Sequence, residues 1–102
     1  MIHNEAFKDC DSLKEIELGE SLNYVGENIF GGCYSLEKIY FNADPSCFKN
    51  FGSIVSLYSL LKECKNFKEL YHKCKRADLL PYLNDESGKQ WRIPFKTIRI
   101  KE

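Results

Sequence analysis

The feature that most constrains this 102-residue chain is an internal repeat in its first half. The segment AFKDCDSLKEIEL at residues 6–18 aligns without a gap on IFGGCYSLEKIYF at residues 29–41. Phe, Cys, Ser, Leu and Ile keep their places in both copies. Self-similarity of this kind indicates supersecondary units that cannot bury their apolar faces alone and therefore stack on one another.

Two further segments repeat the pattern less completely. Residues 61–72 keep the Cys and the apolar positions, except that His72 takes the last of them. Residues 95–100 keep only the apolar positions, and Arg92 stands where the Cys would fall. The distances between successive anchors are larger after the second unit, since the anchors lie at Leu13, Leu36, Phe67 and Phe95. This spacing predicts longer connections in the second half of the chain.

Each unit ends in a pair of apolar residues two positions apart, which on a β-strand point to the same face of a sheet. Strands that are joined by about twenty residues can run parallel, because the connection is long enough to cross back. We therefore predict a core made of the repeat positions, namely Phe7, Cys10, Leu13, Ile16, Leu18, Phe30, Cys33, Leu36, Ile39, Phe41, Cys64, Phe67, Leu70, Phe95, Ile98 and Ile100.

The run Ala-Phe-x-x-Cys-x-Ser-Leu-x-x-Ile-x-Leu from Ala6, with the later pairs Val25-Gly26 and Ile29-Phe30, resembles the BspA-type leucine-rich repeats. The close resemblance covers residues 2–42. It implies an α/β solenoid of three to four parallel strands, with helical crossovers that are enlarged in the C-terminal half. It also implies a non-enzymatic protein–protein interaction module, as a fragment or the C-terminal end of a larger repeat protein. The family is mostly found on bacterial cell surfaces or secreted, although residues 1–10 lack the apolar centre of a signal peptide.

We expect one domain over residues 1–102, with two regular repeats in residues 1–45 and irregular repeats plus a C-terminal cap in residues 46–102. Two interpretations of residues 53–76 remain open. Either a helix at 53–63, capped by Ser46 or Asn50, precedes a strand at 68–72, or the segment is one long helix. The first is favoured because the apolar face of a continuous helix would drift around its axis.

The rest of the C-terminal half is expected to close the stack. Residues 76–80 are helical in character until Pro81, which cannot continue a helix. Residues 91–100 are expected to form a closing strand pair or a last repeat.

The repeat register is already running at Ile2, so the first unit is expected to expose apolar surface and to favour self-association through the N-terminal end. The formal net charge is zero, but residues 1–45 hold nine acidic and three basic side chains, while residues 46–102 hold six acidic and twelve basic. This asymmetry favours head-to-tail contacts between chains that weaken with salt.

The candidate binding surface is the concave strand face, where polar residues alternate with the core positions. One predicted row contains Glu15, Lys38, Glu69 and Thr97, and the next contains Glu17, Tyr40, Tyr71 and Arg99. Tyr and Arg are favoured anchors of protein interfaces, so the predicted binding residues are Glu15, Glu17, Lys38, Tyr40, Glu69, Tyr71 and Arg99. The alternative is that these cross-strand pairs only stabilise the sheet.

The five cysteines are best explained as reduced, mostly buried thiols, since none is paired in a Cys-x-x-Cys motif. Cys64, His72 and Cys74 have ligand chemistry but lack the short paired spacings of zinc sites. No catalytic motif is present, so we expect no enzymatic activity, no cofactor and no metal. The compartment is left open.

Two alternatives to protein recognition remain. The first is a structural end-cap of a bacterial surface protein without binding activity of its own. The second is weak nucleic-acid binding through the basic C-terminal half, which is disfavoured because Glu63 and Glu69 interrupt the basic run from Lys62 to Arg76. No apolar run approaches the roughly 20 residues of a membrane span.

Overall fold

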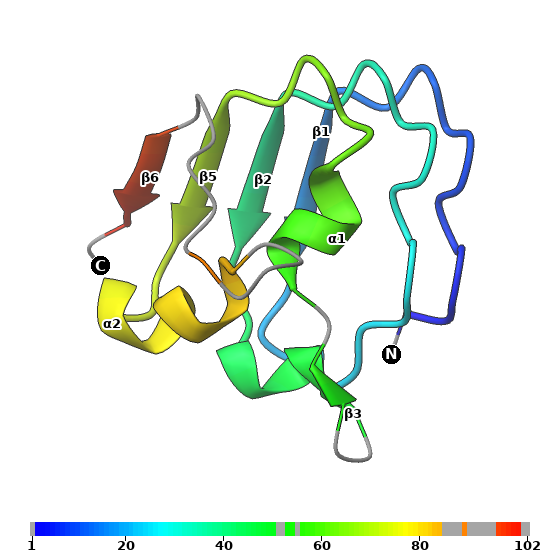
Figure 1. Cartoon of the computed structure of the whole chain (residues 1–102). Coiled ribbons are helices and arrows are strands. Elements are labelled where there is room, and N and C mark those ends of the chain that lie inside the picture. Colours follow the sequence, from blue (N-terminus) through cyan, green and yellow to red (C-terminus); the bar gives the residue numbers. More distant parts are fainter. Residues whose placement is uncertain (1, 51–52, 55, 85–88, 90–95, 101–102) are drawn as a thin grey trace.

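The computed structural model describes residues 2–50, 53–54, 56–84, 89 and 96–100. Its main element is an open parallel sheet in the order β1-β2-β5-β6 (Figure 1). Short helices and one small hairpin lie in the connections, and none of the helices in the described segments is long and apolar enough to cross a membrane. The sheet strands are β1 (Glu15–Leu18), β2 (Lys38–Phe41), β5 (Glu69–His72) and β6 (Lys96–Arg99).

The first three sheet strands have the register that the repeat alignment predicts. Ile16 of β1 is the Cα partner of Ile39 in β2, and Ile39 is the partner of Leu70 in β5. Both pairings are parallel. Because side chains alternate along a strand, the apolar repeat positions all lie on one face of the sheet. The predicted parallel strands are confirmed.

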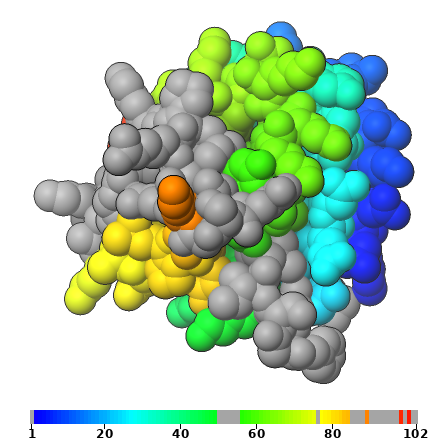
Figure 2. Space-filling view, viewed as in Figure 1, coloured from blue at the N-terminus to red at the C-terminus, as the bar shows by residue number. Residues whose placement is uncertain are grey.

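The backbones of the first two units are stacked along their whole length. The amides of Ile2, Phe7 and Asp9 donate to carbonyls of the second unit, within residues 24–31, at distances of 2.9, 3.0 and 2.7 Å. The rings of Phe7 and Phe30 stack with centroids 5.9 Å apart. Figure 2 shows the two units, in dark blue and cyan, side by side along one edge of the molecule. The two units therefore follow the same path.

A thiol–carbonyl contact recurs where each turn leads into its strand. The Cys33 thiol lies 2.9 Å from the carbonyl oxygen of Phe7, and the Cys64 thiol lies 3.6 Å from that of Phe30. In both cases a Cys of one unit donates to the repeat Phe of the preceding unit. This contact ties the turn of each unit to its neighbour and thereby helps to set where the next strand begins.

The third unit contains the additional structure. After β2 come η1 (Pro45–Phe48), the hairpin of β3 (Lys49–Asn50) with β4 (Ser53–Ile54), and then α1 (Leu57–Leu61). The caps differ from those predicted, because Asp44 caps η1 and Ser56 caps α1, each by accepting a backbone N–H.

The helix-then-strand interpretation of residues 53–76 is the one that the structure supports, since β5 begins at Glu69. A single long helix is wrong. The helix is shorter than predicted, because residues 53–54 pair with β3. The segment after β5 is helical as expected, with α2 at Arg76–Leu79 and η2 at Leu80–Tyr82.

Most predicted core residues are buried, but several apolar residues of the first unit are only half-buried. Leu18, Phe30, Cys33, Leu36, Ile39, Phe41, Cys64, Phe67 and Leu70 are buried, whereas Phe7, Leu13, Ile16, Ile98 and Ile100 are half-buried. The prediction that Cys10 is a core thiol is wrong, because Cys10 is exposed. Within the described residues no unit packs on the outer side of the first one. Self-association at that side stays a prediction, and Phe95 lies outside the described residues.

The register of β6 differs by one residue from the prediction. The alignment predicts Arg99 beside Tyr71, whereas the structure pairs Tyr71 with Ile98 and Arg99 with His72. Thr97 is displaced in the same way. The fourth unit has no Cys at the repeat position, so it lacks the thiol–carbonyl contact that fixes the earlier turns. Neither Arg99 nor Thr97 therefore has its predicted register partner. The prediction that Ile98 is a core position is also wrong, because Ile98 is the register partner of Tyr71 rather than of a core residue.

Candidate interaction surface on the parallel sheet

Six polar side chains project from the sheet opposite the core, and we call this set the polar sheet face. They form two rows across β1, β2 and β5 that follow the Cα register. Both β1 glutamates are exposed, and the other four residues are half-buried. The rows are Glu15, Lys38 and Glu69, and then Glu17, Tyr40 and Tyr71. Six of the seven predicted binding residues thus lie together, and Arg99 is the one that does not belong to them.

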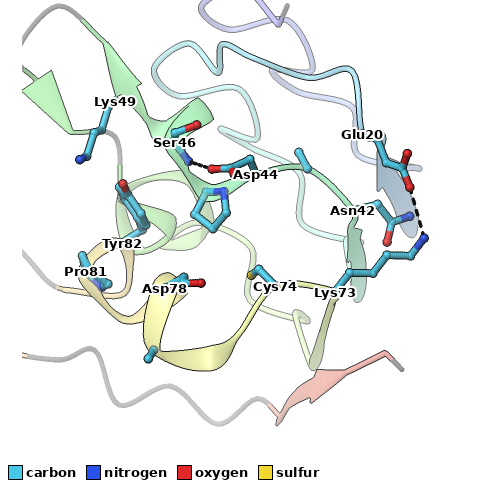
Figure 3. A pocket seen from close by; sticks show the side chains of 13 residues that line it. Glu20, Asn42, Asp44, Ser46, Lys49, Lys73, Cys74, Asp78, Pro81 and Tyr82 are labelled. Carbon is cyan, nitrogen blue, oxygen red and sulfur yellow. Dashed lines mark hydrogen bonds and ion pairs between the residues drawn. The ribbon is translucent and has the colours of Figure 1, made fainter. Parts of the chain in front are cut away.

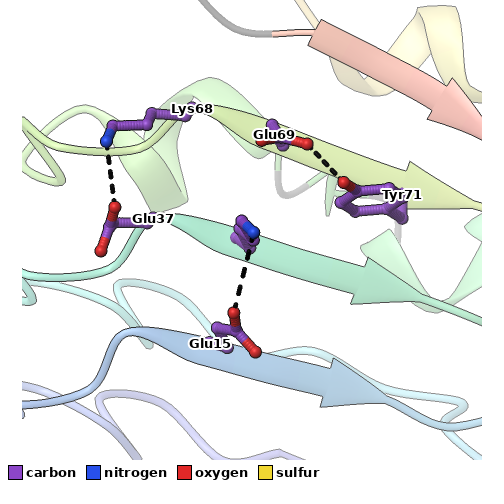
Figure 4. A network of polar contacts seen from close by, with 6 residues as sticks. Glu15, Glu37, Lys68, Glu69 and Tyr71 are labelled. Atoms are coloured by element: carbon purple, nitrogen blue, oxygen red, sulfur yellow. Dashed lines mark hydrogen bonds and ion pairs between the residues drawn. The ribbon is translucent and has the colours of Figure 1, made fainter.

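Two tyrosines stack at the centre of the polar sheet face. The ring centroids of Tyr40 and Tyr71 are 4.8 Å apart, with 14° between the ring planes. The Tyr71 hydroxyl donates a hydrogen bond to the Glu69 carboxylate on the same strand (Figure 4). This bond, with burial and the glutamate charge, raises the pKa of Tyr71 to about 12. The tyrosine pair is therefore held in a fixed orientation.

Charges of opposite sign alternate across the strands. Lys38 Nζ lies 3.9 Å from Glu15 Oε1, and Lys68 Nζ lies 3.1 Å from Glu37 Oε1 at the start of β2. The hydrogen bond and charge of Lys68 lower the pKa of Glu37. Exposed pairs of this kind contribute little free energy, so their role is to orient side chains rather than to hold the sheet together.

A third row, which sequence reasoning missed, continues the polar sheet face at the carboxyl ends of β2 and β5. It consists of Asn42 and Lys73, each two residues after a tyrosine of the second row. The Asn42 side-chain amide donates to Glu17 Oε1 at 2.8 Å, and Lys73 Nζ lies 3.5 Å from Glu20 Oε1. The Asn42 Oδ1 atom is buried and has no hydrogen-bond partner among the described residues. The signal was available, because Asn42 is two residues after Tyr40 and so shares its face.

A family model described as a BspA type leucine rich repeat region (6 copies) matches residues 1–75. The chain belongs to this family. The match extends beyond the two regular repeats and includes β5. Comparisons with curated proteins and with solved structures gave no match. The family suggests a protein-interaction repeat, which agrees in kind with a sheet that presents tyrosines and charges to solvent.

A cleft of about 670 Å³ lies beside the third row, between η1 and α2 of this leucine-rich-repeat chain. Figure 3 shows Asp44 and Ser46 on one wall and Asp78 on the other, with the Lys73–Glu20 ion pair at one end. Asp44 already accepts the backbone N–H of Ser46, which is the main cause of its lowered pKa. The cleft depends on how the helices pack, so the repeat pattern gave no sign of it.

Cys74, which lines the cleft, and the buried His72 do not form a catalytic pair. His72 Nδ1 lies 2.9 Å from the Cys74 carbonyl oxygen and 3.8 Å from the Cys74 sulfur. A carbonyl only accepts, so Nδ1 must donate to it and cannot take the thiol proton. Cys64, the third residue considered for zinc, donates its thiol elsewhere, to Phe30. Within the described segments, no three His, Cys, Asp or Glu residues group as a metal site requires.

The basic run of residues 62–76 is not one continuous cationic stripe. Lys68 pairs with Glu37 and Lys73 pairs with Glu20, on the sheet side of the molecule. Lys65 lies 6.0 Å from the centroid of the Tyr34 ring, at the turn that precedes β5. This dispersal favours the interpretation of the run as a solvated surface over nucleic-acid binding.

Proposed function

We propose that this chain is a short leucine-rich-repeat solenoid whose polar sheet face binds a protein partner. The observation that carries the proposal is the stacked pair of Tyr40 and Tyr71 at the centre of a half-exposed sheet face. Tyrosine is among the residues that dominate binding energy when a partner covers them. No chemistry beyond binding is required of the surface.

Preorganisation supports the proposal. The Tyr71 hydroxyl is held by Glu69, the two rings are nearly parallel, and Asn42 holds the Glu17 carboxylate. Side chains that are already ordered lose little rotamer entropy when a partner binds, so more of the contact energy appears as affinity. Cross-strand pairs that served only the sheet would not need to leave aromatic rings half-exposed.

The test is a selection of binding peptides from a random library on the whole chain, followed by measurement of each binder on two variants. Tyr40→Ala removes a ring from the polar sheet face. Tyr34→Ala is the matched control, since Tyr34 is 52% exposed and lies at a turn away from the strands. We expect most selected peptides to lose at least tenfold in affinity on Tyr40→Ala and less than twofold on Tyr34→Ala. Equal losses on both variants, or none on either, would refute the proposed surface.

A further inference from the structure

We propose that the polar sheet face anchors its partner through an arginine side chain, which stacks on the ring of Tyr40 and donates to the carboxylate of Glu17. The inference rests on the proposed function and names the chemistry of the partner: a protein segment with an exposed arginine. It follows from an aromatic stack with one open end and from a carboxylate fixed beside that end.

The open end of the stack is on the side of β1. Tyr71 covers the face of the Tyr40 ring that is turned toward β5, with centroids 4.8 Å apart. The opposite ring face is turned toward β1, where the register partner of Tyr40 is Glu17 and not a third aromatic residue. In the part of the chain that the structure describes, no lysine or arginine forms a cation–π contact with the Tyr40 ring, whereas Lys65 lies over the Tyr34 ring.

The carboxylate beside the open ring is held in place. Glu17 is exposed, and its Oε1 atom accepts a hydrogen bond of 2.8 Å from the Asn42 side chain. This bond restrains the side chain on the β2 side while leaving Oε2 to accept from a ligand. Adjacent strands are about 4.8 Å apart, so a planar group that stacks on Tyr40 would lie directly over β1 near this oxygen.

The charge around this position favours a cation. The six residues of the polar sheet face include three glutamates and one lysine, Lys38. In the third row the charge of Lys73 is matched by Glu20, at 3.5 Å. Lys38 Nζ lies 3.9 Å from Glu15 Oε1, in the other row. Glu17 has no ion pair within 4.0 Å in the described structure. A cationic group from a partner would therefore meet an uncompensated carboxylate.

Arginine fits both elements at once, and lysine does not. A guanidinium is planar, so it can lie flat on a tyrosine ring while its N–H groups, which lie in its own plane, reach a carboxylate at the ring's edge. An ammonium group is compact and strongly hydrated, so it gains the charge interaction but little from the ring. We therefore expect the site to distinguish arginine from lysine.

The experiment uses three short peptides of the form acetyl-Gly-Gly-Xaa-Gly-Gly-amide, in which Xaa is arginine, lysine or citrulline, titrated into the whole chain and followed by NMR. Citrulline keeps the planar shape and removes the charge. We expect the arginine peptide to shift the Tyr40 and Glu17 signals, with lysine binding several-fold more weakly and citrulline about tenfold more weakly. Equal shifts with all three peptides, or arginine shifts that leave Tyr40 and Glu17 unaffected, would overturn the arginine anchor.

Matched variants separate this inference from the function on which it rests. Glu17→Gln should weaken the arginine peptide about tenfold, while Glu27→Gln, an exposed glutamate outside the polar sheet face, should change it less than twofold. If library-selected peptides depend on Tyr40 but tolerate Glu17→Gln and replacement of their arginines by citrulline, the proposed function stands and the arginine anchor fails. If selected peptides do not depend on Tyr40, the proposed function fails first.

Discussion

The first two repeats and the third place their strands in one parallel sheet, but the connections between these strands differ. The chain between β1 and β2, at residues 19–37, is a plain coil whose carbonyl groups at residues 24–31 accept hydrogen bonds from amides of the coil at residues 2–9. The longer connection between β2 and β5, at residues 42–68, contains η1, a hairpin and α1. Equivalent positions of the first two units even share a left-handed backbone, with φ of 60° at Glu5 and 56° at Asn28.

The strand half of the repeat is the same in both regions. The Cys33 and Cys64 thiols each donate to the Phe carbonyl of the unit before, and the strands that follow are in one register. The comparison teaches that the turn and strand define the unit, while the crossover can be exchanged. The polar sheet face is built on the half that does not vary.

The largest expected effect comes from core truncation in the strand half, where the two regions should respond alike. Ile39 and Leu70 are register partners with 0% and 1% exposure, so Ile39→Ala and Leu70→Ala should each lower the free energy of unfolding by about 2–5 kcal/mol. Ile16→Ala, at a half-buried position in β1, should cost less. Denaturant unfolding measures all three. A much smaller loss of unfolding free energy for Leu70→Ala than for Ile39→Ala would show that the strand half is not equivalent in the two regions.

A smaller effect should be confined to the coil half of the first region. A Cβ atom at Gly26 would lie 2.6 Å from the carbonyl carbon of His3, while at Gly19 it would meet nothing within 4 Å. Gly26→Ala should therefore destabilise the chain by about 1–3 kcal/mol, because two backbones must move apart. Gly19→Ala should stay within about 0.5 kcal/mol in the same thermal or denaturant assay. Equal effects would mean that the coils are not stacked as described.

The cysteine series tests the contact that both regions share. Cys33→Ala and Cys64→Ala remove a buried donor and should each cost about 1–2 kcal/mol, whereas Cys10→Ala should cost less than about 0.5 kcal/mol. Alkylation of the folded chain should modify Cys10 quickly and reach the two buried thiols only after unfolding. Rapid alkylation of Cys33 or Cys64 in the native state would count against the repeat arrangement.

The smallest expected effect at neutral pH is the contribution of two buried thiols to the pH dependence of stability, which becomes larger at alkaline pH. Burial raises the pKa of Cys47 and of Cys64 to about 12, above the ordinary value of 9.0. The folded chain then holds protons that the unfolded chain releases, so stability is full below about pH 9 and falls as the pH rises toward 12. The variant with both Cys47→Ala and Cys64→Ala should show a shallower fall between about pH 9 and pH 10 in unfolding experiments. If the stability of the variant falls as steeply with pH as that of the unmodified chain, the pH dependence comes from groups other than these two thiols.

The repeat alignment was sufficient to predict the register of the first three strands of the sheet, because a strand that buries alternate residues tolerates only one register. The alignment alone therefore puts Glu15, Lys38 and Glu69 in one row, as they are in the fold. It failed at β6, where an apolar match was used without the Cys that anchors the other turns. Cys10 was misassigned for a related reason, since a repeat position is buried only when another unit covers it.

The candidate surface was predictable in part for the same physical reason. Tyr40 and Tyr71 follow from strand alternation and register alone. The contact between Asn42 and Glu17 could have been inferred one step beyond the strand end, but its geometry depends on side-chain conformations. The cleft beside it depends on where η1 and α2 pack, and local patterns do not determine the packing of short helices.

The central claim is that the unvarying half of the repeat presents the binding surface, and NMR mapping of a library-selected peptide on the whole chain tests it most directly. The account predicts that the largest shifts fall on the polar residues of β1, β2 and β5, with Tyr40 and Glu17 foremost. Shifts that gather on the coils at residues 2–9 and 24–31, or on Asp44, Asp78 and Tyr82 around the cleft, would contradict it.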